Sequence, residues 1–201
     1  MKNKLFCALL FAALISSCAT LQKPNDLQKS KQLQMHLQRW QHFRIDGIIQ
    51  VNHNNLILRK NVTFRKNENI LRLDIFDTGF LGLSPTPFLS VSLDSTLIIR
   101  NPNNLKIPLI TRDDFLFFLE ISELLKYQNE IITNKKVKIN GYEFNFTENY
   151  EISQIVKNSN LVKFQYAEFI TAIAFQNNES VVAEISIDTI NFNKPNIPKL
   201  K

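Results

Sequence analysis

The chain has 201 residues, of which 44% are hydrophobic and 21% charged, and its formal net charge is +6. These proportions are those of a globular protein, and they exclude disorder along the whole chain. The length favours a single domain. Only four glycines are present, so a glycine-rich phosphate-binding loop is nearly excluded, whereas 16 phenylalanines exceed what an ordinary core needs.

The first residues have the pattern of a secretory signal. Lys2 and Lys4 precede an apolar run over residues 5–15, and small residues follow it. This order of charged, apolar and small residues is typical of a signal peptide. The run is too short to cross a bilayer, which takes about 20 residues, so a membrane anchor or a buried helix is the weaker alternative.

The end of this segment, Ile15-Ser16-Ser17-Cys18, resembles a bacterial lipobox. The resemblance implies removal of residues 1–17 as a lipoprotein signal peptide and acylation (palmitate among the chains) of Cys18. The residue after the cysteine is Ala19 rather than the aspartate that signals inner-membrane retention, which implies the periplasmic face of the outer membrane. Residues 18–26 are polar and predict a short acylated tether, which keeps the folded body near the membrane.

Processing also removes the thiols. Cys7 leaves with the signal peptide and Cys18 carries lipid, so the mature chain has no free cysteine for a disulfide, a metal site or a nucleophile.

The next segments predict one helix followed by a run of strands. Apolar side chains at Leu33, Leu37 and Trp40 follow a helical spacing and predict an amphipathic helix over residues 27–42. The period then changes to two, which is typical of half-buried strands. We expect strands over residues 43–51, 56–64, 71–75, 89–93 and 96–100, with polar turns at 53–55 and 66–69.

A second helix and a second set of strands follow. Thr111 and Asp114 have the spacing of a capping box, which predicts a helix start. Strands are expected over residues 137–139, 142–146, 150–156, 161–175, with a break near Ala167 left open, and 181–192, before an irregular tail over 193–201. Consecutive strands with short turns form an antiparallel meander. We therefore predict a mainly β fold with helices, an open and unclosed antiparallel β-barrel whose helical lid covers an apolar cavity, as one domain over residues 27–201.

One predicted loop, residues 77–87, breaks the rule that hairpin turns are short and polar. It carries Phe80, Leu81 and Leu83 among glycines and prolines. Two interpretations stay open. The three side chains fold back onto the core, or they form an exposed apolar finger for a membrane or a protein partner.

Several of these features resemble the LolA/LolB-like lipoprotein-localisation family, and its outer-membrane receptor LolB more than its periplasmic carrier. They are the lipobox, the helix ending at Trp40, the strand opening 43–47, and the strand 71–76 that leads into Gly79-Phe80-Leu81-Gly82. The resemblance implies a protein that accepts acylated lipoproteins or lipid from a periplasmic LolA-like carrier and inserts them into the outer membrane. Leu81 matches the family's membrane-inserting leucine, with Phe80 and Leu83 as substitutes. The tryptophan-glycine motif common after the central helix of LolB is absent.

An acyl-binding cavity needs a wide apolar lining, which phenylalanine supplies without a polar group to satisfy. The candidate lining residues are Phe64, Phe115, Phe118, Leu119, Phe144, Phe164 and Phe175. The alternative for each is a side chain that simply fills the core.

Catalytic patterns are missing from the sequence. The three histidines, His36, His42 and His53, have no metal-ligand spacing. Residues 82–86 lack the second glycine of a nucleophile elbow. We expect no enzyme, cofactor or metal, no nucleic-acid partner, and a monomer. The alternative function is a non-catalytic lipid-binding or assembly lipoprotein that docks a partner through the loop carrying Phe80 to Leu83.

Overall fold

A computed structural model describes residues 25–53, 56–77, 87–101, 111–177 and 180–200. Cys18 and the loop residues Phe80, Leu81 and Leu83 lie outside the described residues. The helices are α2 (Asp26–Arg39), α3 (Asp113–Glu120), the 3-10 helix η1 (Ile121–Tyr127) and α4 (Gln128–Asn134). The strands are β1 (His42–His53), β2 (Leu56–Asn67), β3 (Ile70–Phe76), β4 (Pro87–Leu93), β5 (Leu97–Arg100), β6 (Lys136–Ile139), β7 (Tyr142–Phe146), β8 (Ile152–Lys157), β9 (Asn160–Tyr166), β10 (Ile170–Asn177) and β11 (Ser180–Asn191).

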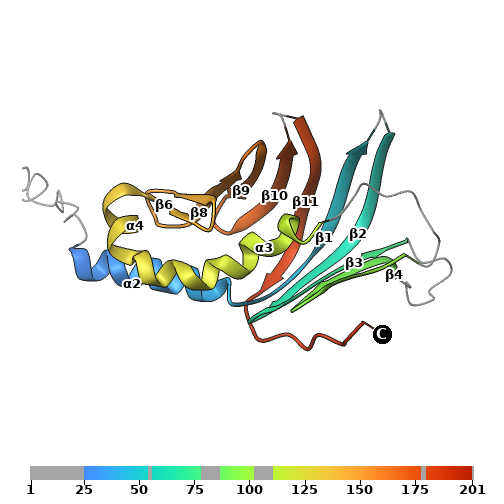
Figure 1. Ribbon diagram of the computed structural model, residues 1–201, viewed down its shortest axis with the longest axis horizontal. Coiled ribbons are helices and arrows are strands. Elements are labelled where there is room, and N and C mark those ends of the chain that lie inside the picture. The colour runs from blue at the N-terminus through green and yellow to red at the C-terminus, as the bar shows by residue number, and fades with distance from the viewer. Residues whose placement is uncertain (1–24, 54–55, 78–86, 102–110, 178–179, 201) are drawn as a thin grey trace, which may run out of the picture.

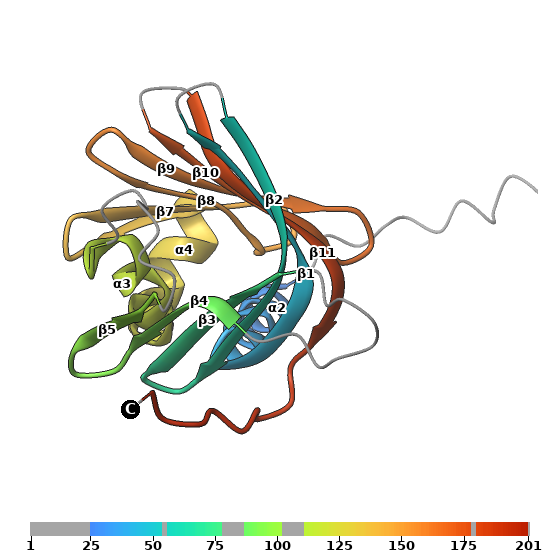
Figure 2. The same cartoon turned by 90° about the vertical axis from the view of Figure 1, so that its right-hand side faces the viewer.

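All eleven described strands form one antiparallel sheet in the order β5-β4-β3-β2-β1-β11-β10-β9-β8-β7-β6. The sheet curves around the helices and stays open between β5 and β6, as Figures 1 and 2 show. Its two halves are joined by the pairing of β1 with β11, which brings the first and last described strands side by side. The predicted fold class, an open antiparallel barrel with helices on its concave side, is confirmed.

Helix α2 follows from local sequence signals. Asn25 and Gln28 form a capping box in which each side chain accepts a hydrogen bond from the other residue's backbone N–H. Leu33, Leu37 and Trp40 are buried against the sheet. The helix begins at Asp26, so the last residue assigned to the tether is helical. Among the described residues no helix is long and apolar enough to cross a membrane.

The start of the second helical segment differs from the prediction. Thr111 does not cap α3; Arg112 holds the N-cap position without a side-chain hydrogen bond. The backbone N–H and the hydroxyl of Thr111 instead donate to the Asp114 carboxylate, at 2.7 and 2.9 Å. The helix also does not continue as one α-helix, because residues 121–127 tighten into η1 before α4 begins.

The predicted turn at residues 66–69 is also wrong in part. Strand β2 continues to Asn67 and the turn comprises only Glu68 and Asn69. Lys66 is fully buried on the concave face, opposite Phe43. Its charge misled the prediction, because a lysine next to asparagines is usually part of a solvated turn.

The convex face of β1 to β4 carries polar side chains rather than apolar ones. Asp74 accepts hydrogen bonds from Arg72 Nε at 2.9 Å and from Ser90 Oγ at 2.6 Å, and all three residues are buried. The C-terminal tail passes beside this network, since Arg72 donates to the carbonyl oxygen of Pro198. The tail therefore helps to shield a buried ion pair on the outside of the sheet (Figure 2).

Candidate functional site

The concave face carries a continuous apolar row that crosses eight strands. Each member lies directly opposite the next in the antiparallel register, so their side chains share one face of the sheet. We call this row the concave belt; in order from β2 to β6 it comprises Leu58, Val51, Ala183, Phe175, Val162, Ile155, Phe144 and Val137.

The belt changes from buried to exposed along its length. Val137, Phe144 and Ile155 are buried in the core, on strands that Figure 2 shows beside α3 and α4. Phe175 is half-buried, and Leu58 is 42% exposed. An apolar surface therefore runs without a polar interruption from the interior to the open end of the sheet.

Beside the belt, an aromatic cluster joins α2 and α3 to the sheet. The Trp40 ring lies 5.5 Å from that of Phe43 and 5.3 Å from that of Phe164. Phe118 of α3 lies 4.8 Å from Phe64 of β2, both measured between ring centroids. Such edge-on contacts stabilise the core by about 0.5–1.5 kcal/mol per pair beyond the area they bury.

The seven predicted lining residues all belong to the apolar core or pack against it. Phe64, Phe118, Phe144 and Phe164 are buried, while Phe115, Leu119 and Phe175 are partly buried. Phe64, Phe115 and Phe118 pack ring against ring, so these three fill space next to α3. Phe144 and Phe175 belong to the belt. Their role in holding an acyl chain stays a prediction.

The structure also adds residues that the sequence analysis missed as site candidates. Val51, Leu58 and Ala183 form the more exposed part of the belt, and Trp40 lies at the centre of the aromatic cluster. Alternation alone placed Val51 and Leu58 on a strand face. It could not show that this face continues across β11 and β10, because that depends on the pairing of distant strands.

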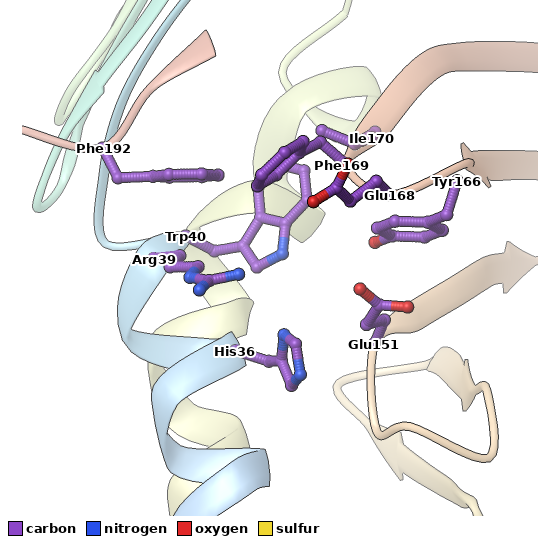
Figure 3. A pocket seen from close by; sticks show the side chains of 9 residues that line it. All are labelled: His36, Arg39, Trp40, Glu151, Tyr166, Glu168, Phe169, Ile170 and Phe192. Atoms are coloured by element: carbon purple, nitrogen blue, oxygen red, sulfur yellow. The ribbon is translucent and has the colours of Figure 1, made fainter.

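A small pocket lies at the other end of the sheet, where α2 meets the turn between β9 and β10 (Figure 3). Its volume is about 30 Å³, the room of a water molecule rather than of an acyl chain. The lining residues are His36, Arg39, Trp40, Glu151, Tyr166, Glu168, Phe169, Ile170 and Phe192. None of them belongs to the belt.

The charged groups of this pocket are affected by burial. Burial and the neighbouring Arg39 lower the pKa of His36. Burial raises the pKa of Glu151, which Arg39 partly opposes. Burial also raises the pKa of Tyr166, whose hydroxyl donates to the Ile152 carbonyl at 2.9 Å. Tyr166 is thereby held as a neutral donor, and its role is to fasten β9 to β8.

A wider and more open groove, of about 590 Å³, lies between α2 and α4. It is lined by Asp26, Lys29, Ser30, Gln128, Asn129, Ile132 and Thr133. Six of these seven side chains are polar, so the groove does not suit an acyl chain.

No protein-family model and no curated protein matches this chain. Among solved structures, the crystal structure of a LolA superfamily protein, NE2245 from Nitrosomonas europaea, is 8% identical in sequence. The similarity covers 85% of this chain and 94% of that chain, with a TM-score of 0.41. The function of this chain therefore has to be inferred from its own residues.

Proposed function

We propose that this protein is an acyl-binding lipoprotein that accepts acylated proteins from a periplasmic carrier and passes them to the outer membrane. In this proposal it is anchored through Cys18 at the periplasmic face of that membrane. It holds the acyl chain by apolar contacts alone and performs no chemistry on it.

The observation that carries the proposal is the concave belt. An acyl chain offers no hydrogen-bonding group, so its binding depends on apolar area removed from water, worth about 25 cal/mol per Å². The belt offers such area in one uninterrupted row, and its exposed end at Val51 and Leu58 gives a chain a place to enter. A gradient from exposed to buried also suits a ligand that must be both taken up and released.

The sequence features at the N-terminus support the location. A lipobox at residues 15–18 followed by Ala19 is what an outer-membrane lipoprotein requires. The polar tether after Cys18 is short, so an anchored domain would stay close to the bilayer that receives the cargo.

The test is the binding of a fluorescent dipalmitoylated lipopeptide to the full chain carrying Cys18→Ser, so that its own acyl chains do not compete. Phe175→Glu places a carboxylate in the half-buried part of the belt. We expect it to weaken binding by about tenfold or more, because desolvating a charge beside an acyl chain costs well over 1.4 kcal/mol.

The matched control is Gln165→Glu, which adds the same carboxylate at an exposed position on β9. It should leave the affinity unchanged. Failure of the unsubstituted belt to bind the lipopeptide would contradict the proposal and would favour the alternative of an assembly lipoprotein that docks a partner through residues 80–83.

A further inference from the structure

The end of strand β2 departs from the pattern of the rest of its outer face. On the convex side β2 carries polar residues at Arg59, Asn61 and Thr63, all in the same alternation. Ile57 continues that alternation and is 70% exposed. Its neighbour Leu58 points to the concave side and is 42% exposed, so the end of β2 is apolar on both faces.

Strand β11 adds a third apolar side chain at the same place. Val182 is 39% exposed and lies one step beyond the Val51–Ala183 pair, which puts it on the convex side. Ile57 is paired with Asn52 of β1, the strand between β2 and β11. With strands about 4.8 Å apart, Ile57 and Val182 flank Asn52 within roughly 10 Å of each other.

The ends of β1, β2, β10 and β11 project together at one end of the molecule, beyond the helices (Figures 1 and 2). We call Ile57, Leu58 and Val182 the apolar tip. Each apolar side chain held in water forgoes burial worth about 1.5–3 kcal/mol, so a cluster of three at a projecting end indicates a contact surface.

The two-sided character of the tip decides what covers it. A protein partner that docks on a sheet covers one face, and only one face would then need to be apolar. A bilayer surrounds a projecting tip and removes water from both faces at once.

The charges behind the tip fit an anionic membrane surface. The next convex row of the sheet runs from Arg59 through Gln50, Glu184 and Ala174 to Lys163. Arg59 and Lys163 are exposed, whereas Glu184 is half-buried. Long cationic side chains one row behind a buried tip can reach lipid phosphates, at about 1 kcal/mol each.

We infer that the apolar tip enters the interfacial region of an anionic phospholipid bilayer. This contact is independent of whether the protein carries an acyl chain. It lies on other residues than the predicted loop at Phe80, Leu81 and Leu83.

The test uses the fact that the chain has one tryptophan, Trp40, which is buried in the core. Ile57→Trp and Val182→Trp each add a second tryptophan at the tip of the full chain. The control, Phe169→Trp, adds it at an exposed aromatic position in the β9–β10 turn, at the opposite end of β10. The probe is a vesicle of phosphatidylcholine and phosphatidylglycerol with brominated acyl chains, which quench tryptophan only within the bilayer.

We expect vesicles to quench and blue-shift the added emission of both tip variants, and not that of Phe169→Trp. Adding Arg59→Gln to Ile57→Trp should raise the lipid concentration needed for half-maximal quenching. Tip variants that respond no more than the control, including a chain that does not bind the vesicles, overturn the inference, and a protein partner for the tip then becomes the better explanation. Neither result depends on lipopeptide binding, so it is separable from the test of the belt.

Discussion

The ammonium group of Lys66 is fully buried and donates a hydrogen bond of 2.8 Å to the backbone carbonyl of Trp40. Trp40 is the C-cap of α2, where helical carbonyls lack partners and the helix dipole is negative. The pair ties the end of α2 to the middle of the sheet. It also leaves a lysine in an apolar environment, and burial lowers its pKa to about 8.

This lysine predicts an unusual pH dependence of stability. In the unfolded chain the pKa of Lys66 is near its ordinary value of 10.5, and in the fold it is about 8. Between these values the unfolded chain binds the extra proton, so the free energy of unfolding rises with pH, by up to about 1.4 kcal/mol per unit. Below pH 8 both states are protonated, and the cost of the buried charge is fully present.

Urea denaturation at several pH values between about 8 and 10 measures this slope, and Lys66→Met is the control that should lack it. The range stops near pH 10 because burial raises the pKa of Tyr166 above its ordinary value of 10.0. Neutral Tyr166 therefore stabilises the fold only up to that pH and opposes the trend above it. Equal slopes for wild type and Lys66→Met would show that Lys66 is not the responsible group.

Gly47 allows β1 to approach β11 closely. The register of these strands shifts between Asp46 and Gly47, and a Cβ at position 47 would lie 2.1 Å from the Ser186 carbonyl oxygen. Gly47→Ala must therefore push the two halves of the sheet apart. We expect it to lower the free energy of unfolding by about 2 kcal/mol or more, measured by urea denaturation.

The control for this substitution is Gly141→Asn. Gly141 has a φ of +82° and open space around it, and asparagine tolerates a left-handed backbone. Its stability should change by less than about 1 kcal/mol. A Gly47→Ala protein as stable as this control would contradict the close approach.

Asp74 and Asp46 allow a comparison of a buried with an exposed ion pair. Asp74 pairs with Arg72 and lies 3.4 Å from Arg65 Nη2, and the side chains of both arginines are largely buried. Asp74→Asn leaves two cations without their counter-charge, which should cost about 3–5 kcal/mol of stability. Asp46→Asn loses a pair with Arg44, whose side chain is half exposed, and should cost about 1 kcal/mol or less.

Thermal and urea unfolding of the two variants gives these losses directly. Equal losses would mean that the C-terminal tail and Ser90 do not shield the Asp74 network from solvent.

Phe118 is the α3 residue that holds the helical segment on the sheet. It is fully buried, with ring-centroid distances of 4.8 Å to Phe64 and 6.0 Å to Phe43. Phe118→Ala should destabilise the protein by about 3–5 kcal/mol, because a cavity remains among rings from separate elements. Phe115→Ala removes a partly buried ring 6.5 Å from Phe64 and should cost clearly less. The reverse order in urea denaturation would show that the centre of the cluster lies elsewhere.

The sequence by itself determined what depends on short-range periodicity. The spacing of Leu33, Leu37 and Trp40 predicted the buried face of α2, and alternation predicted the strands and the break between Tyr166 and Ile170. It failed at Lys66 and at Thr111, where charge and capping patterns gave the ordinary local reading. In both places a tertiary contact prevails, since Lys66 is held by Trp40.

Only the tertiary structure decided which faces join. The pairing of β1 with β11 connects opposite ends of the chain, and that pairing turns Val51, Ala183 and Phe175 into one belt and brings Ile57 beside Val182. A strand's period of two tells which residues share a face, but not which strand lies next to it. The neighbour is selected by packing against the helices and by the register of a distant strand, and neither is written in any local stretch of residues.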